Sequence, residues 1–225
     1  MVNSMDNLDN KKNLLYDYMN SAEDIAILGG SFNPIHNGHI AMADAAHEMC
    51  KTDVLLLPNK TTYYKDNTAL AKDEDRLAMV RFAAEERDYL MYSDMEIKRG
   101  GVTHTIDTIR VLKSVNPDRR IYFIIGGDSL EWIDRWVDAE ELLENIIVLT
   151  AVRGATDRNR SEELIRKIKS SIPASDIRML EMDSIDISST DIRKRAQENR
   201  SLKGLVPEKI EDYIKEKNLY VGANK

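Results

Sequence analysis

Residues 25–39 decide how this chain folds, and they read IAILGGSFNPIHNGH. The first four form a short apolar run without polar alternation, which predicts a strand buried on both faces. Residues 40–50 are rich in Ala and Met and predict a helix. Between the two, Gly29 and Gly30 end the strand and a His-x-Gly-His sequence opens the helix.

The turn between this strand and this helix has the chemistry of an anion site. Glycines let a backbone approach a ligand closely, and a helix N-terminus presents unpaired N–H groups that favour anions. His36 and His39 are three residues apart, so both imidazoles can reach one phosphate group. The alternative is a plain turn with two solvated histidines. The strand, the glycine pair and the Phe-x-Pro of residues 32–34 together favour the phosphate site.

Strand and helix patterns alternate along the rest of the chain. Strands are expected at residues 53–58, 91–97, 121–125, 145–151 and, more weakly, 177–181, and helices at residues 73–88 and 105–115. This order predicts an α/β fold: a Rossmann-like doubly wound parallel sheet with a small C-terminal helical region. Ligands of such sheets lie beyond the carboxyl ends of the strands, where the winding reverses.

Composition limits the class of protein. With 225 residues, of which 42% are hydrophobic, residues 24–225 are expected to form one domain, and the polar, acidic residues 1–23 a tail outside its core. Cys50 is alone, which excludes an intramolecular disulfide and predicts a reducing, cytoplasmic setting. The net charge of −7 argues against a nucleic-acid surface, and the apolar runs are too short to predict a membrane partner.

Residues 187–195, ISSTDIRKR, form a second candidate site. They could be an ordinary helix start, with a serine as N-cap and Asp191 in the first turn. They could also clamp a triphosphate, because hydroxyls and N–H groups at a helix start bind phosphate oxygens and Arg193 follows one turn later. The clamp would consist of Ser188, Ser189, Thr190 and Arg193.

The two motifs together resemble a known enzyme family. Residues 29–39 are similar to the opening motif of bacterial nicotinate-nucleotide adenylyltransferases, which belong to the His-x-Gly-His nucleotidylyltransferase superfamily. Residues 187–193 resemble that family's Ile-Ser-Ser-Thr-x-Ile-Arg signature, which contacts the β and γ phosphates of ATP. The resemblance covers nearly all of residues 24–221 in motif order. It implies a single nucleotidylyltransferase domain that joins the AMP part of ATP to nicotinate mononucleotide, giving deamido-NAD and pyrophosphate.

The resemblance assigns roles on the ATP side of the site. His36 and His39 are the expected catalytic residues, acting on the α and β phosphates. Asp128 follows a predicted strand in a Gly-x-Asp sequence and is expected to contact ribose, although an Asp there is often only a helix N-cap. The expected ATP-binding residues are Gly29, Gly30, Ser31, Phe32, Gly38, Gly126, Asp128, Ser188, Ser189, Thr190 and Arg193.

The acceptor side matches the family less closely. Trp136 lies where the family has the tryptophan that stacks on the pyridine ring, and Asn33 and Thr105 are also expected to bind the acceptor. Trp132 would share a helix face with Trp136 and is expected to be structural. Several neighbouring positions depart from the family: His104 replaces a tyrosine, prolines are missing before it and between Arg153 and Gly154, and residues 61–65 lack a Pro-Pro-His-Lys sequence.

These departures keep alternatives open for the acceptor, which could be nicotinamide mononucleotide or phosphopantetheine, and a non-catalytic ATP-binding module is the non-enzyme alternative. The Trp-bearing insertion counts against phosphopantetheine, and the absence of a Lys-Met-Ser-Lys loop counts against an aminoacyl-tRNA synthetase. Mg²⁺ is expected to arrive on the ATP phosphates, without protein metal ligands. Whether the chain forms a homo-oligomer is left open.

Overall fold

The computed structural model describes residues 24–61, 70–152, 154–183 and 185–221. They form a six-stranded sheet in which all neighbouring strands run parallel, in the order β3-β2-β1-β4-β5-β6. The strands are β1 (Ile25–Gly30), β2 (Val54–Pro58), β3 (Leu90–Tyr92), β4 (Ile121–Ile125), β5 (Ile147–Val152) and β6 (Asp176–Glu181). The chain winds outward from β1 to β3, returns to β4 beside β1, and continues to β6. The doubly wound sheet is therefore confirmed, with its switch point between β1 and β4.

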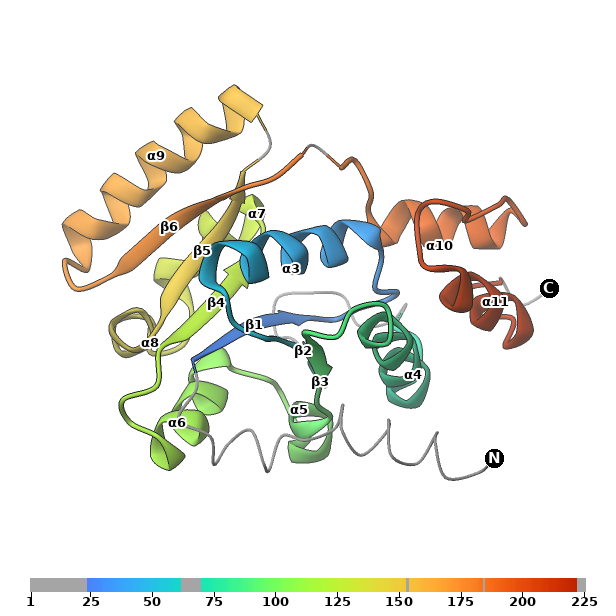
Figure 1. Cartoon of the computed structure of the whole chain (residues 1–225), viewed down its shortest axis with the longest axis horizontal. Coiled ribbons are helices and arrows are strands. Elements are labelled where there is room, and N and C mark those ends of the chain that lie inside the picture. Colours follow the sequence, from blue (N-terminus) through green and yellow to red (C-terminus); the bar gives the residue numbers. More distant parts are fainter. Residues whose placement is uncertain (1–23, 62–69, 153, 184, 222–225) are drawn as a thin grey trace.

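Helices cover both faces of the sheet (Figure 1). They are α3 (Asn37–Cys50), α4 (Asp73–Ala84), α5 (Met95–Arg99), α6 (Thr105–Val115), α7 (Gly127–Leu130), the 3₁₀ turn η1 (Ile133–Arg135), α8 (Ala139–Asn145), α9 (Gly154–Ser171), α10 (Ser189–Gln197) and α11 (Glu208–Glu216). Alternate residues of β1 enter opposite cores, as the pleat of a strand requires. Ala26 and Leu28 pack with α3, α4, α10 and α11, whereas Ile25 and Ile27 pack with α6, α8 and α9.

One predicted strand is wrong in part. Residues 91–97 alternate like a strand, but β3 ends at Tyr92, and α5 begins at Met95. The Ser93 N–H still donates to Leu56 O, after which the Ser93 hydroxyl oxygen accepts a hydrogen bond from the Met95 N–H and turns the chain. The helix predicted over residues 73–88 also ends earlier, at Ala84. Hydrogen bonds at the chain reversal outweigh the alternating pattern here.

Some predictions fall outside the described residues. These are the tail of residues 1–23, positions 62–65 of the altered loop, and residue 153. The division of the chain into a tail and one domain therefore remains a prediction. In the described part of the chain, no helix combines the length and the apolar character needed to cross a membrane.

Candidate active site

The two histidines of the first motif lie against each other at the start of α3. His36 is the N-cap residue, with extended backbone, and His39 is in the first helical turn. Their rings stack with centroids 3.7 Å apart and planes 30° from parallel. The His36 N–H donates to His39 Nδ1 at 3.2 Å. A neutral imidazole that accepts at Nδ1 carries its proton on Nε2, so His39 presents Nε2–H as a donor.

Close packing fixes the position of these rings. His36 is 7% exposed, and a Cβ at Gly38 would lie 3.1 Å from its Nδ1 and 3.2 Å from its Cε1. Only glycine at position 38 leaves the His36 ring this space. Phe32 packs edge-on against His39, with centroids 5.2 Å apart. A Cβ at Gly30 would in turn lie 3.1 Å from Phe32, so the glycine that ends β1 allows the aromatic packing.

The second motif starts α10 and contacts the first directly. Ser188 is the N-cap of α10, and its Oγ accepts the Asp191 N–H at 3.1 Å, as the helix-start interpretation requires. The Ser189 hydroxyl donates to Pro34 O at 2.9 Å. Arg193 Nη1 donates to Asn33 O at 2.9 Å, although the two residues are 160 positions apart. The structure therefore places the N-terminus of α10 and the Arg193 guanidinium beside residues 31–39, the histidine turn.

The start of α3 is also held by the segment between α10 and α11. The Asn37 main-chain N–H donates to Leu205 O and its side-chain Nδ2 to Gly204 O, both at 2.9 Å. The C-terminal helical region thus packs against the histidine turn. Figure 1 shows α10 next to the start of α3.

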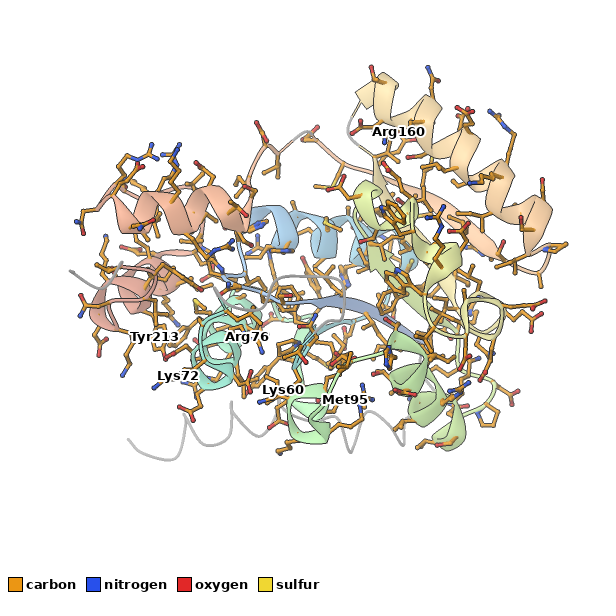
Figure 2. All side chains as sticks on the ribbon, turned by 180° about the vertical axis from the view of Figure 1, so that it is seen from behind. Lys60, Lys72, Arg76, Met95, Arg160 and Tyr213 are labelled. Atoms are coloured by element: carbon orange, nitrogen blue, oxygen red, sulfur yellow. The ribbon has the colours of Figure 1, made fainter. Side chains whose placement is uncertain are left out.

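Arg76 is a buried charge that the sequence analysis missed. It is fully buried, and its Nη1 donates to Ser31 O at 2.8 Å. Its Nη2 donates to Lys60 O at 3.3 Å and to Asp73 Oδ1 at 2.6 Å, and Lys60 also pairs with Asp73. Figure 2 labels both Arg76 and Lys60. Arg76 ties the turn after β1 to Lys60, two residues after the end of β2. The signal was a charged residue on the apolar face of α4, in register with Val80 and Ala83.

The predicted ribose contact lies at the same edge of the sheet. Gly126 is the N-cap of α7, and its carbonyl accepts the Ser129 N–H at 3.0 Å. Asp128 is therefore not the N-cap of the helix, and its side chain is exposed one residue into α7. Because β4 pairs with β1, the glycines that end β1 and Asp128, which follows β4, both lie at the switch point.

Comparison with known proteins agrees with this geometry. A family model described as cytidylyltransferase-like matches residues 27–195. A protein of Dehalococcoides mccartyi named "Probable nicotinate-nucleotide adenylyltransferase" is 36% identical over 196 residues, covering 86% of this chain and 95% of that protein. A protein of the same name from Lachnoclostridium phytofermentans is 33% identical over 198 residues, covering 88% and 98%. The chain belongs to the nicotinate-nucleotide adenylyltransferase family.

A solved structure shows that the fold is that of the family. Plasmodium falciparum nicotinic acid mononucleotide adenylyltransferase complexed with NaAD superposes with a TM-score of 0.72 at 21% identity, covering 88% of this chain and 97% of that one. The resemblance inferred from the two motifs is thus confirmed at the level of family and fold.

The residues expected on the family's acceptor side are not all arranged as predicted. Trp132 and Trp136 do not share a helix face, because they flank the short η1 turn. Trp132, expected to be structural, is 54% exposed, with the Arg135 guanidinium 4.6 Å above its ring. Trp136 is half-buried and meets Phe123 edge-on, with centroids 6.2 Å apart. Thr105 is the first residue of α6, at the N-terminal end of a helix.

Asn33 has structural partners in addition to its predicted role with the acceptor. It is 6% exposed, and its Oδ1 accepts two hydrogen bonds, from the Ala71 N–H at 2.9 Å and the Tyr220 hydroxyl at 3.0 Å. Tyr220, near the end of the described chain, was not singled out from the sequence. A single tyrosine after the last helix gives no periodic or motif signal.

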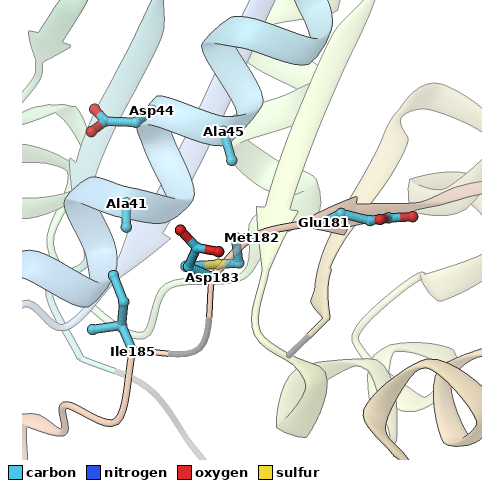
Figure 3. Close-up of a pocket in the computed structure, with 7 residues that line it drawn as sticks. All are labelled: Ala41, Asp44, Ala45, Glu181, Met182, Asp183 and Ile185. Carbon is cyan, nitrogen blue, oxygen red and sulfur yellow. The ribbon is translucent and has the colours of Figure 1, made fainter. Parts of the chain in front are cut away.

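A pocket of about 530 Å³ lies along α3. Figure 3 shows its lining, which comes from α3, from the end of β6 and from the segment that follows it. The lining residues are Ala41, Asp44, Ala45, Glu181, Met182, Asp183 and Ile185. None of them is a predicted site residue, so this pocket does not coincide with the candidate active site.

The donor set of the site suits anions rather than a bound cation. The side chains at the histidine turn are imidazoles, hydroxyls and a guanidinium. In the described ranges, His, Cys, Asp and Glu form no group of three or more that could hold a metal ion.

Proposed function

We propose that the chain transfers the adenylyl group of ATP to nicotinate mononucleotide, giving deamido-NAD and pyrophosphate, a step of NAD biosynthesis. The observation that carries the proposal is the junction of the two motifs. The bonds from Arg193 to Asn33 O and from Ser189 to Pro34 O bring the start of α10 to the histidine turn. Family membership and the position at the sheet's switch point support the same assignment.

The site would act mainly by stabilising charge on ATP. We assign His36 and His39 to the α and β phosphates, where Nε2–H of His39 donates to the oxygens that gain charge as pyrophosphate leaves. The leaving pyrophosphate would be held by Ser188, Ser189, Thr190 and Arg193. The Arg193 guanidinium has five N–H donors, of which one bonds to Asn33 O and one to the Thr190 hydroxyl, so the others can bind phosphate oxygens. The N-termini of α3 and α10 add main-chain N–H groups and favourable helix dipoles.

The acceptor needs orientation rather than activation. Its 5′-phosphate is largely dianionic at neutral pH, because the second pKa of such a group is about 6. It can attack the α phosphate of ATP without a general base or a covalent enzyme intermediate. Positioning and preorganised donors would therefore supply most of the rate enhancement, as in other phosphoryl-type transfers.

We propose Asn33, Thr105 and Trp136 for acceptor binding and Gly29, Gly30, Ser31, Phe32, Gly38, Gly126 and Asp128 for ATP. Mg²⁺ is treated as part of the substrate, bound to the phosphates of ATP and to water. The single Cys50 supports a cytoplasmic location for the enzyme.

The test is a comparison of acceptors. Purified protein is given MgATP with nicotinate mononucleotide, nicotinamide mononucleotide or phosphopantetheine, and pyrophosphate and dinucleotide products are measured. We expect the highest kcat/KM with nicotinate mononucleotide. Equal or reversed values for the first two acceptors would refute the preference for the acid, and ATP binding without turnover of any acceptor would favour a non-catalytic module.

A further inference from the structure

The last described residues of the chain return to the turn that carries the histidines. The Tyr220 hydroxyl donates to Asn33 Oδ1 at 3.0 Å, a contact between residues 187 positions apart. The preceding helix α11 packs on α4, and the Leu219 N–H closes the helix by donating to Ile214 O at 2.9 Å. The C-terminus therefore delivers one tyrosine side chain to the site.

The backbone at Tyr220 shows that this placement is held by its surroundings. Its φ of 65° is in the left-handed region, which residues with a Cβ rarely adopt unless other contacts compensate. Those contacts are the packing of its ring against the core that contains Ala26 and Leu28, and the bond to Asn33. Burial raises the pKa of the Tyr220 hydroxyl, against the opposing effect of the nearby charges of Arg193 and Arg76. The hydroxyl thus stays protonated as a donor at physiological pH.

The bond from Tyr220 fixes a side chain at the centre of the site's connections. Because Asn33 Oδ1 accepts from both Tyr220 and Ala71, the amide is held in one orientation. The main-chain oxygen of the same residue accepts from Arg193, and the next carbonyl, Pro34 O, accepts from Ser189. His36 follows two residues later. A shift of Asn33 would therefore move the phosphate clamp and the histidine turn relative to each other.

We propose that Tyr220 is a positioning residue for adenylyl transfer: its hydroxyl fixes the Asn33 side chain and thereby aligns Arg193 and His36 with the phosphates of ATP. The inference rests on the proposed function for its effect on turnover, and on the proposed ATP site for its effect on ATP binding. Small displacements of positioning groups have large effects, since a misplacement of about 1 Å can cost about 100-fold in rate.

The test compares Tyr220→Phe with Tyr213→Phe. Tyr213, labelled in Figure 2, is a matched control, because its hydroxyl also makes one hydrogen bond from the C-terminal region, to Asp75 Oδ1 on α4 at 2.9 Å. Both variants lose one tyrosine hydroxyl, but only Tyr220 bonds to the histidine turn. We expect Tyr220→Phe to lower kcat/KM for ATP about tenfold, with a loss of Tm similar to that of Tyr213→Phe. Tyr213→Phe should keep the wild-type kinetics.

Binding of a non-hydrolysable ATP analogue, measured by calorimetry, separates this inference from the proposed function. If the wild-type protein turned over no acceptor, the proposed function would fail, while weaker analogue binding by Tyr220→Phe than by Tyr213→Phe would still support positioning. Analogue affinities within twofold of each other in the two variants would overturn the inference. A loss of activity in Tyr220→Phe that only followed its loss of Tm would also overturn it.

Discussion

Replacing Gly38 with alanine should separate the stability of this protein from its activity. The added Cβ would lie 3.1 Å from His36 Nδ1, so the imidazole would have to move by a few tenths of an ångström. That ring is 7% exposed and stacked at 3.7 Å on His39, so the displacement would reach both histidines. If 1 Å costs about 100-fold, a shift of about 0.3–0.5 Å should lower kcat about four- to tenfold.

The same substitution should not unfold the protein. Gly38 is inside α3 and has no positive φ, and alanine is favoured over glycine in a helix by about 1 kcal/mol. The tight contact offsets part of this gain, so we expect Tm to stay constant or rise slightly. Ala41→Gly is the control, because it makes the reverse change one turn along the same helix.

The assay is kcat and Tm measured for both variants. Ala41→Gly should lose about 1 kcal/mol, or about 2–4 °C in Tm for a chain of this size, and keep its kcat. Wild-type kcat in Gly38→Ala would show that the His36 ring has more freedom than its contacts imply. A parallel loss of kcat and Tm in Gly38→Ala would show that the glycine serves the fold instead.

Three further predictions address separate parts of the molecule. His39→Ala should lower kcat by about 10²–10³ without changing the circular dichroism spectrum, because one preorganised donor is lost; near wild-type turnover would contradict its catalytic role. Arg193→Ala should raise the KM for ATP, because a charge-assisted contact with phosphate is lost. Trp136→Ala should instead raise the KM for the acceptor about ten- to a hundredfold by removing a stacking surface. Unfolding of the Trp136 variant, or a change in its kinetic constants for ATP, would assign Trp136 to the core. Burial raises the pKa of the Glu96 carboxyl above 4.5, so its contribution to stability falls as pH rises from about 4.5 through the folded pKa. In urea unfolding, Glu96→Gln should therefore gain stability relative to wild type as pH rises from about 4 to about 8. A stability difference that does not change with pH would refute the pKa shift.

Much of the site was predictable because its chemistry is local in sequence. The strand, the glycines and the histidines of residues 25–39 are consecutive, so short-range geometry places them on a strand, a turn and a helix start. A serine N-cap could likewise be predicted for the second motif, because serine is favoured before a helix, and the structure assigns that position to Ser188 rather than Ser189. The strand predicted over residues 91–97 was wrong in part because the Ser93 turn and the buried bond from Thr108 to Glu96 favour a helix over alternation.

The sequence by itself determined the α/β class and the order of the strands along the chain, because each depends on neighbours within one element, and it located the two motifs, residues 29–39 and 187–193. Only the tertiary structure decided which of these residues meet. Arg193 reaches Asn33 across 160 positions and Tyr220 reaches it across 187, while Arg76 is buried between two loops. Such contacts depend on how α4, α10 and the C-terminus pack around the end of β1. No periodicity encodes that arrangement, because each contact is a single hydrogen bond whose partners are set by the packing of whole helices.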